Sequence, residues 1–197
     1  MIKIAIDIDN VIVDFFNNFC EYCKQNSVNY SEDMREEALA SGFNYRFDVR
    51  GVEFSSLFKR FTDEGRHYSS NLIDADMLRT FVRLFTGAPH SCFVTSRPLK
   101  TQVETIERLK NQEFADVLKD VPIFWSSDTY RKAEVIKDIG GITHFIDDQT
   151  AYLKEVKWAN PEITTLWFNA YAMPSSVCPK DAIEMNSWTE VLDFLKL

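Results

Sequence analysis

The sequence predicts an α/β protein with a doubly wound parallel sheet of about five strands, and two observations carry this prediction. Short apolar runs stand at 2–7, 91–96, 121–126, 143–148 and 163–168, and segments with helical periodicity separate the later four. The runs are continuously apolar and do not alternate with polar residues, which is typical of parallel strands covered on both faces. Helices between such strands indicate crossover connections, so we expect helices on both sides of the sheet.

The composition is that of a folded domain with an insertion. The chain has 197 residues, of which 45% are hydrophobic and 26% charged, and its net charge is −8. Such an acidic chain without a basic block is not expected to bind nucleic acid or an anionic membrane. No apolar run approaches the ~20 residues of a membrane helix. Four cysteines are too few for a disulfide framework, so we expect a cytoplasmic protein with Cys20 and Cys23 in its core.

One interval breaks the alternation of strands and helices. About 80 residues separate the first apolar run from the second, far more than a crossover helix needs. Apolar residues recur there at i, i+3, i+4 and i+7, first as Phe54, Leu57, Phe58 and Phe61, and then as Leu78, Phe81, Val82 and Phe85. This spacing favours packing over stacking on a ligand. We expect a helical cap at 14–87 and a core domain made of 1–13 and 88–197.

Local signals mark the ends of three helices. Pro98 suits the first position of a helix whose apolar face is Leu99, Val103, Ile106 and Leu109. Asp128 is a candidate N-cap for the helix in "YRKAEVIKDIGG", and the two glycines would end that helix. Ser187 is expected to cap the last helix, with Glu190 completing a capping box. The segment 171–181 is expected to be a loop.

Polar side chains stand where the expected strands end or where the next helix begins. Because ligands of an open α/β sheet bind at the carboxyl ends of the strands, these side chains should share one crevice. They are Asp7, Asp9, Thr95, Ser96, Lys132, Asp147 and Asp148. Clustered carboxylates need a cation among them, and oxygen ligands without a cluster of His or Cys favour Mg²⁺ over zinc. The set suits phosphoryl transfer, in which an aspartate attacks phosphorus while lysine and hydroxyl donors balance the charge.

Four motifs, in this order, resemble those of the haloacid dehalogenase (HAD) superfamily of phosphotransferases. "IAIDIDNV" is similar to its DxDx(T/V) signature, "CFVTS" to its strand ending in Thr or Ser, "YRKAEVI" to its lysine motif and "FIDD" to its terminal acidic pair. The resemblance spans residues 2 to about 150, and the long insertion lies where many members carry a helical cap. "IDIDNVIVDF", "VTSRP" and "IDDQ" look most like the 5′-nucleotidase and deoxyribonucleotidase branch, in which glycine is common at the position of Asn10.

The resemblance implies the catalytic and metal-binding residues. Asp7 is then the nucleophile that becomes aspartyl-phosphate. Asp9 protonates the leaving alcohol and later deprotonates the hydrolytic water. Mg²⁺ is held by Asp7, by the backbone carbonyl of Asp9 and by Asp147, while Asp148 orients a water molecule bound to the metal.

The resemblance also implies the phosphate-binding residues and the reaction. Thr95 and Lys132 bind phosphoryl oxygens, Ser96 adds a further contact, and Lys132 also offsets the charge of Asp7. Asp14 lies at the entry to the expected cap. The implied enzyme is a Mg²⁺-dependent phosphatase of small phosphomonoesters such as (deoxy)nucleoside 5′-monophosphates.

Other functions stay open at this stage. A 3′-phosphatase acting on nucleic-acid ends is weakly indicated by "TSRP", although the acidic charge argues against it. A signalling receiver domain gathers similar residues, but its acidic pair comes early and it lacks a long insertion. A non-catalytic phosphate-binding protein of the same fold predicts the loss of a chemical residue, and all of them are present. The sequence also leaves a homodimer open.

Overall fold

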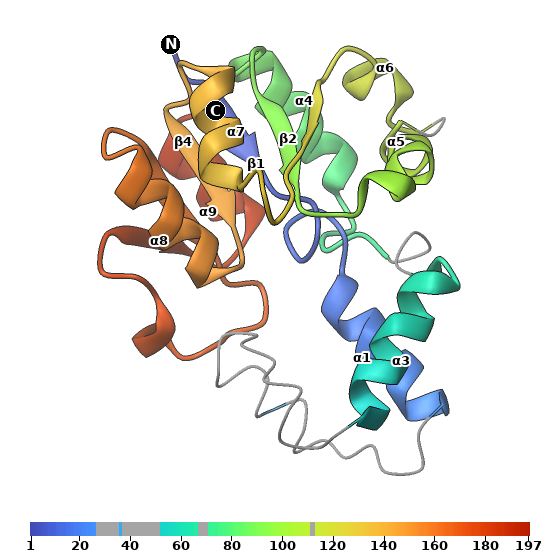
Figure 1. Ribbon diagram of the computed structural model, residues 1–197. Coiled ribbons are helices and arrows are strands. Elements are labelled where there is room, and N and C mark those ends of the chain that lie inside the picture. Colours follow the sequence, from blue (N-terminus) through green and yellow to red (C-terminus); the bar gives the residue numbers. More distant parts are fainter. Residues whose placement is uncertain (27–35, 37–51, 67–70, 111–112) are drawn as a thin grey trace.

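The expected fold class is confirmed, with one strand more than expected. The structure, a computed structural model, describes residues 1–26, 36, 52–66, 71–110 and 113–197 (Figure 1). Among these residues, six parallel strands form one sheet in the order β3-β2-β1-β4-β5-β6. They are β1 (Ile4–Ile6), β2 (Cys92–Thr95), β3 (Ile123–Trp125), β4 (His144–Asp147), β5 (Thr164–Phe168) and β6 (Ala182–Met185). The additional strand is the edge strand β6. Only Met185 of its residues is buried, so it lacks the continuous apolar run by which the other strands were predicted.

The sheet is covered by helices on both faces. Ile4 and Ile6 of β1 pack with α4 (Met77–Gly87), α6 (Ala115–Leu118) and α9 (Trp188–Leu195). Ala5, between them, packs in a second cluster with α7 (Lys132–Ile139) and α8 (Thr150–Ala159). Successive residues of a strand point to opposite faces. Both faces therefore need apolar residues, which explains the continuous runs.

Two helices lie beside the sheet and form a core of their own. α1 (Phe15–Asn26) and α3 (Val52–Asp63) contact each other away from the strands (Figure 1). Their shared core is Phe19, Tyr22, Cys23, Leu57 and Phe61. The opposite side of α1 packs under the sheet through Phe16 and Cys20. Cys20 and Cys23 are buried, as expected.

The helix α4 packs against the sheet, although its residues were expected within the cap. The ring centroids of Phe81 and Phe85 lie 6.1 and 5.8 Å from that of Phe93 in β2. Leu78 and Val82, expected on the buried face, are 38% and 45% exposed. We therefore propose that the cap ends between α3 and α4, before the expected boundary at residue 87.

The helix after β2 differs from its expected pattern. Pro98 precedes a 3₁₀ turn, η3 (Leu99–Thr101), and α5 (Gln102–Leu109) follows it. Leu99 and Val103 are 66% and 63% exposed, whereas Thr105 is fully buried. The predicted apolar face is therefore wrong at Leu99 and Val103, whereas Leu109 is buried as expected.

The ends of the last helices test the expected caps. The prediction of Asp128 as N-cap is wrong, because α7 begins at Lys132 with Arg131 as its N-cap. Gly140 ends this helix with φ of 66°, as expected for a glycine at that position. Ser187 caps α9 by accepting the Glu190 N–H at 3.2 Å. The Glu190 carboxylate accepts the N–H of Asn186 at 2.7 Å and not that of Ser187.

A short 3₁₀ turn, η4 (Ser175–Val177), interrupts the loop expected at 171–181.

Among the described residues, none of the helices combines the length and the apolar character needed to cross a bilayer.

Candidate active site

The candidate site lies at the carboxyl ends of the central strands. β1 pairs with β2 on one side and with β4 on the other, so the chain order reverses at β1. Asp7 directly follows β1, and its N–H donates to the carbonyl of Ile146 in β4 at 2.9 Å. Asp147 ends β4, and Thr95 ends β2. The switch point of the sheet therefore brings together residues that are far apart in the sequence, as expected for open α/β sheets.

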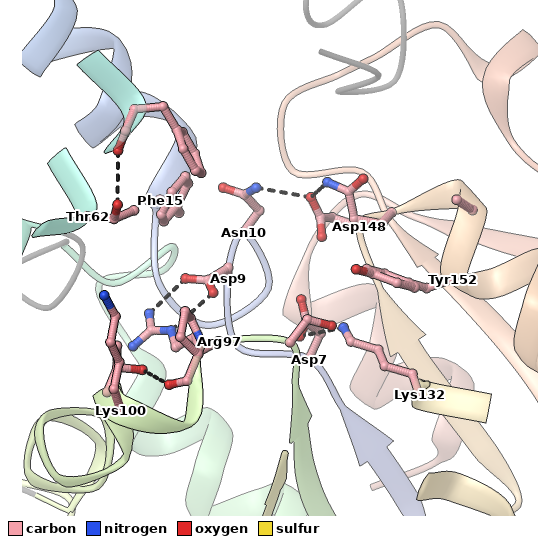
Figure 2. Close-up of a pocket in the computed structure, with 16 residues that line it drawn as sticks. Asp7, Asp9, Asn10, Phe15, Thr62, Arg97, Lys100, Lys132, Asp148 and Tyr152 are labelled. Atoms are coloured by element: carbon pink, nitrogen blue, oxygen red, sulfur yellow. Dashed lines mark hydrogen bonds and ion pairs between the residues drawn. The ribbon is translucent and has the colours of Figure 1, made fainter. Parts of the chain in front are cut away.

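A tight loop directs the two aspartates of "DID" to different places. The N–H groups of Ile12 and Val13 donate to the carbonyl of Ile8 at 2.9 and 3.0 Å. Asn10 has φ of 60°, in the left-handed region that glycine and asparagine tolerate best. Asp7 points toward Lys132, whereas Asp9 points toward Arg97 (Figure 2).

Lys132 is a buried cation held between two carboxylates. Its Nζ lies 2.7 Å from Asp7 Oδ1 and 2.7 Å from Asp147 Oδ2, and its side chain is 1% exposed. The Tyr152 ring lies 4.5 Å from Nζ and adds a cation–π contact. One carboxylate oxygen from each of Asp7, Asp147 and Asp148 lies within 4.8 Å of the others, and all three residues are buried. Three carboxylates thus face one buried cation.

Burial sets the protonation of this acidic group. It raises the pKa of Asp7 to about 7, although the charge of Lys132 acts in the opposite direction. Burial likewise raises the pKa of Asp147, again against the charge of Lys132, and raises that of Asp148, where the charge of Asp147 adds to the effect. For Lys132, burial acts to lower the pKa, but the charges of Asp147 and Asp7 outweigh it and raise the pKa. The site therefore favours an additional positive charge.

The raised pKa of Asp7 predicts how pH affects the stability of the metal-free protein. The group changes from a pKa of 3.8 in the unfolded chain to about 7 in the folded chain. Between these values the folded state binds more protons, so the contribution of Asp7 to the free energy of unfolding falls as the pH rises. Urea unfolding in EDTA from about pH 5 to about pH 8 should show this fall as the difference between the native chain and Asp7→Asn.

Burial lowers the pKa of His144, and this group makes the free energy of unfolding rise with pH. Because His144 contributes equally in both chains, the difference between the native chain and Asp7→Asn isolates the contribution of Asp7. A stability difference between native and variant chains that is constant or rises over the interval would contradict the raised pKa of Asp7.

A hydrogen-bond network orients Asp148. Its Oδ2 accepts from Asn10 Nδ2 at 3.0 Å and from Gln149 Nε2 at 3.3 Å. Asn10 Oδ1 accepts the Phe16 N–H at 2.8 Å and thereby also fixes the start of α1. Tyr171 Oη lies 3.1 Å from this Oδ1 and 2.6 Å from Asp14 Oδ1. A glycine in place of Asn10 would satisfy the backbone angle and lose these bonds.

Asp14 belongs to the start of α1, at the expected entry to the cap. Its Oδ1 accepts the Asn17 N–H at 3.2 Å, which is a helix-capping bond. The Tyr171 hydroxyl links Asp14 to the site, because it contacts both Asp14 Oδ1 and Asn10 Oδ1. The contacts of Asp14 therefore serve to fix the start of α1.

Arg97 is a site residue that the sequence reasoning missed. Its Nε and Nη2 donate to Asp9 Oδ2 and Oδ1 at 3.0 and 2.7 Å, which makes a two-pronged ion pair. Its Nη1 lies 3.3 Å from Thr105 Oγ1, and its side chain is 4% exposed. The available signal was an arginine two residues after the end of a strand, in "VTSRP". Asn10 and Tyr171 were also missed, and only tertiary contacts reveal them.

The structure separates the two expected hydroxyl residues. Thr95 is fully buried, and its Oγ1 accepts the Arg97 N–H at 3.1 Å. Ser96 is exposed and its Oγ lies 2.9 Å from Ser126 Oγ. Ser96 also lies on the wall of the cavity at this site. The phosphate contacts of both residues stay predictions.

A cavity of about 730 Å³ opens at this site. One side is polar and includes Asp7, Asp9 and Lys132, while Phe15, Phe58 and Tyr152 supply aromatic surface (Figure 2). Phe15 and Phe58 come from the α1/α3 pair, and their ring centroids lie 6.0 Å apart. A volume of this size suits a small ligand, because such sites occupy about 300–1,000 Å³.

Comparison with solved structures gives matches over nearly the whole chain. HAD-hydrolase YfnB from Bacillus subtilis, bound to magnesium, matches with a TM-score of 0.64 at 19% identity, over 100% of this chain and 99% of that one. A HAD family hydrolase from Deinococcus radiodurans with bound phosphate and sodium matches with a TM-score of 0.64 at 11% identity, over 98% and 94%. A family IA HAD hydrolase from Entamoeba histolytica matches with a TM-score of 0.63 at 12% identity, over 100% of both chains.

The chain has the HAD fold. No family model and no curated protein matches its sequence. At these identities the likeness establishes the fold alone, so the chemistry of this HAD-fold protein has to be argued from its own residues. Those residues, Asp7, Lys132 and Asp147, lie where β1 and β4 end.

Proposed function

We propose that the protein is a Mg²⁺-dependent phosphomonoester hydrolase that forms an aspartyl-phosphate at Asp7. The observation that carries the proposal is the buried Lys132, 2.7 Å from both Asp7 and Asp147 beside an open cavity. The charge of Lys132 opposes the rise in the pKa of Asp7 that burial causes and so favours the ionised carboxylate that a nucleophile requires.

The donor set supports a magnesium ion. The three carboxylates of Asp7, Asp147 and Asp148 are buried with one lysine, so a divalent cation would balance their charge. All three offer oxygen, the ligand atom that Mg²⁺ prefers. We propose that Asp7, Asp147 and the backbone carbonyl of Asp9 hold the ion and that Asp148 orients its ligand shell. When bound, the ion would supply charge stabilisation for the phosphoryl oxygens.

In the first half of the proposed reaction, a carboxylate oxygen of Asp7 attacks phosphorus. The bond between phosphorus and the leaving oxygen breaks, and its electron pair goes to that oxygen. Asp9 donates a proton to the same oxygen, which leaves as an alcohol. Lys132 stays protonated, because its pKa is raised, and its charge stabilises the phosphoryl group.

In the second half, water attacks the phosphorus of the aspartyl-phosphate. Asp9, now ionised, takes the proton of the water, and the bond between Asp7 and phosphorus breaks to restore the carboxylate. The products are inorganic phosphate and the starting enzyme. Thr95, Ser96 and Lys132 are the proposed donors to the phosphoryl oxygens, and the position of Ser96 on the cavity wall supports its part in this set.

The cavity supports small phosphomonoesters with an aromatic group, such as (deoxy)nucleoside 5′-monophosphates. Phe15 and Phe58 line the cavity together with Asp7 and Asp148, and a planar base can stack on aromatic rings. Both rings belong to the α1/α3 pair, which we propose as the cap of the enzyme. The aromatic spacing of this pair was expected to serve packing only, and here Phe58 serves both packing and the cavity.

Phosphate release from a panel of phosphomonoesters tests the proposal. We expect turnover with Mg²⁺ that EDTA abolishes, and the highest kcat/KM for nucleoside 5′-monophosphates. An oligonucleotide with a 3′-phosphate belongs in the same panel, because a preference for it would replace the mononucleotide assignment. Absence of phosphate release from every member of the panel would contradict a hydrolase. Formation of a stable phosphoryl adduct without turnover would indicate the non-catalytic alternative.

A further inference from the structure

Arg97 and Asp9 form a two-pronged ion pair, and the proposed reaction as described so far gives Arg97 no role. Both nitrogens of the guanidinium fork face both oxygens of one carboxylate, at 3.0 and 2.7 Å. The arginine side chain is 4% exposed and the aspartate side chain 27% exposed. Both residues line the cavity, and the arginine is the more buried of the two.

The arginine is itself held in place from two directions. Thr105 Oγ1, on a fully buried residue of α5, lies 3.3 Å from Nη1. The backbone N–H of Arg97 donates to Thr95 Oγ1 at 3.1 Å, which ties the arginine to the end of β2. A side chain fixed at both ends can impose one orientation on its partner, because little rotational freedom is left.

We propose that Arg97 is a positioning residue that aims the carboxylate of Asp9 at the leaving-group oxygen. The proposal rests on the proposed function, since it assigns a partner to the proton-transfer residue of that reaction. Asp7 is bound by Lys132 and Asp9 by Arg97, so the two carboxylates of one short motif turn toward opposite cations (Figure 2). The phosphoryl group then has Asp7 on one side, and Asp9 stays at the side from which the alcohol leaves.

The buried Thr105 supports this role against a purely structural one. Thr105 is a polar residue on the buried face of α5. It is 0% exposed, and its hydroxyl oxygen contacts the guanidinium of Arg97. On the same helix, Val103 is 63% exposed, whereas Leu109 is 2% exposed. The buried face of this helix thus includes a polar side chain that contacts the arginine.

The geometry also predicts that lysine cannot fully replace arginine. An ammonium group is a single point of charge and cannot place two N–H bonds on two carboxylate oxygens at once. Arg97→Lys would keep the charge and lose the fixed angle of the carboxylate. We therefore expect Arg97→Lys to be intermediate between the native chain and Arg97→Gln.

The test compares two classes of substrate in one enzyme preparation. An aryl ester such as p-nitrophenyl phosphate leaves without protonation, whereas an alkyl ester such as a nucleoside 5′-monophosphate needs a proton from Asp9. With Arg97→Gln, kcat/KM should fall at least about tenfold more for the alkyl ester than for the aryl ester. The ratio of the two values is independent of the folded fraction, so a partly unfolded variant still gives a valid result.

Two further variants complete the design. Lys119→Gln removes an exposed positive charge that does not line the cavity and serves as the charge control, with an unchanged ratio of alkyl to aryl kcat/KM. In a double-mutant cycle, Arg97→Gln should cost less than about threefold for the alkyl ester once Asp9 is already Asn, because its effect runs through Asp9.

The outcomes separate this inference from the function on which it rests. Equal losses on both esters, or full additivity with Asp9→Asn, would overturn the positioning role and leave the hydrolase intact. No phosphate release by the native chain would overturn the hydrolase and the positioning role together. A selective loss on the alkyl ester, relieved in part by Arg97→Lys, would support the inference.

Discussion

Asp7→Asn is expected to abolish phosphate release from both aryl and alkyl esters, by at least about a thousand-fold. An amide oxygen is a poor nucleophile and cannot form the aspartyl-phosphate. The substitution also removes one of the two carboxylates that hold Lys132 at 2.7 Å. Steady-state release of phosphate with Mg²⁺ measures the loss. Trapping of the phosphoprotein after rapid quenching reports whether the covalent intermediate forms.

Asp9→Asn is the matched comparison for this variant. It changes the second aspartate of the same motif in the same way, but we expect it to spare the aryl ester more than the alkyl ester. The two aspartates therefore fail differently. In metal-free buffer near pH 8, Asp7→Asn should be at least as stable as the native chain, because it removes a buried charge whose protonation is favoured up to about pH 7. Comparable turnover by Asp7→Asn and the native chain would overturn the assignment of the nucleophile.

Lys132→Met is expected to cause the largest loss of stability among these substitutions. It leaves Asp7 and Asp147 buried without their cation, and removing one partner of a buried ion pair costs about 3–5 kcal/mol. The cost should appear as a lower midpoint of urea unfolding in EDTA near pH 8. It should shrink as the pH falls toward about 7, because Asp7 without the pKa-lowering charge of Lys132 becomes protonated in the folded variant at a higher pH than in the native chain.

A control for this variant lies on the same helix. Lys137→Met changes an exposed lysine of α7 in the same way, and we expect it to alter stability by no more than about 0.5 kcal/mol. Lys132→Met should also lose phosphatase activity, because no cation would remain to stabilise the phosphoryl oxygens. Equal effects of the two lysine substitutions would contradict the buried ion pair as a source of stability.

The parallel sheet and the location of the site could both be predicted from local sequence. The continuous apolar runs predict strands covered on both faces, and Ile4, Ala5 and Ile6 do pack alternately into two clusters. The acidic residues at the strand ends were predicted to converge, and Asp7 and Asp147 lie on either side of Lys132. These predictions succeed because a parallel sheet brings the ends of its strands to one edge, whatever the loops do.

Helix faces and caps were predicted less well. The apolar periodicity after β2 predicted that Leu99 of η3 and Val103 of α5 are buried, and both are exposed. The helix instead buries Thr105, because the guanidinium of Arg97 needs a polar neighbour there. Likewise, α4 was expected in the cap, but its phenylalanines pack on Phe93 of the sheet. Periodicity alone predicts an amphipathic helix and not the surface that the helix covers.

The sequence by itself determined the order of the elements, the edge of the sheet that carries the chemistry, and the residue types present there. Only the tertiary structure decided how those residues pair. Arg97 holds Asp9, and Asn10 holds Asp148. The physical reason is that strand and helix signals are local, whereas these two pairs join residues 88 and 138 positions apart in the chain. Such contacts exist only once β1, β2 and β4 lie side by side.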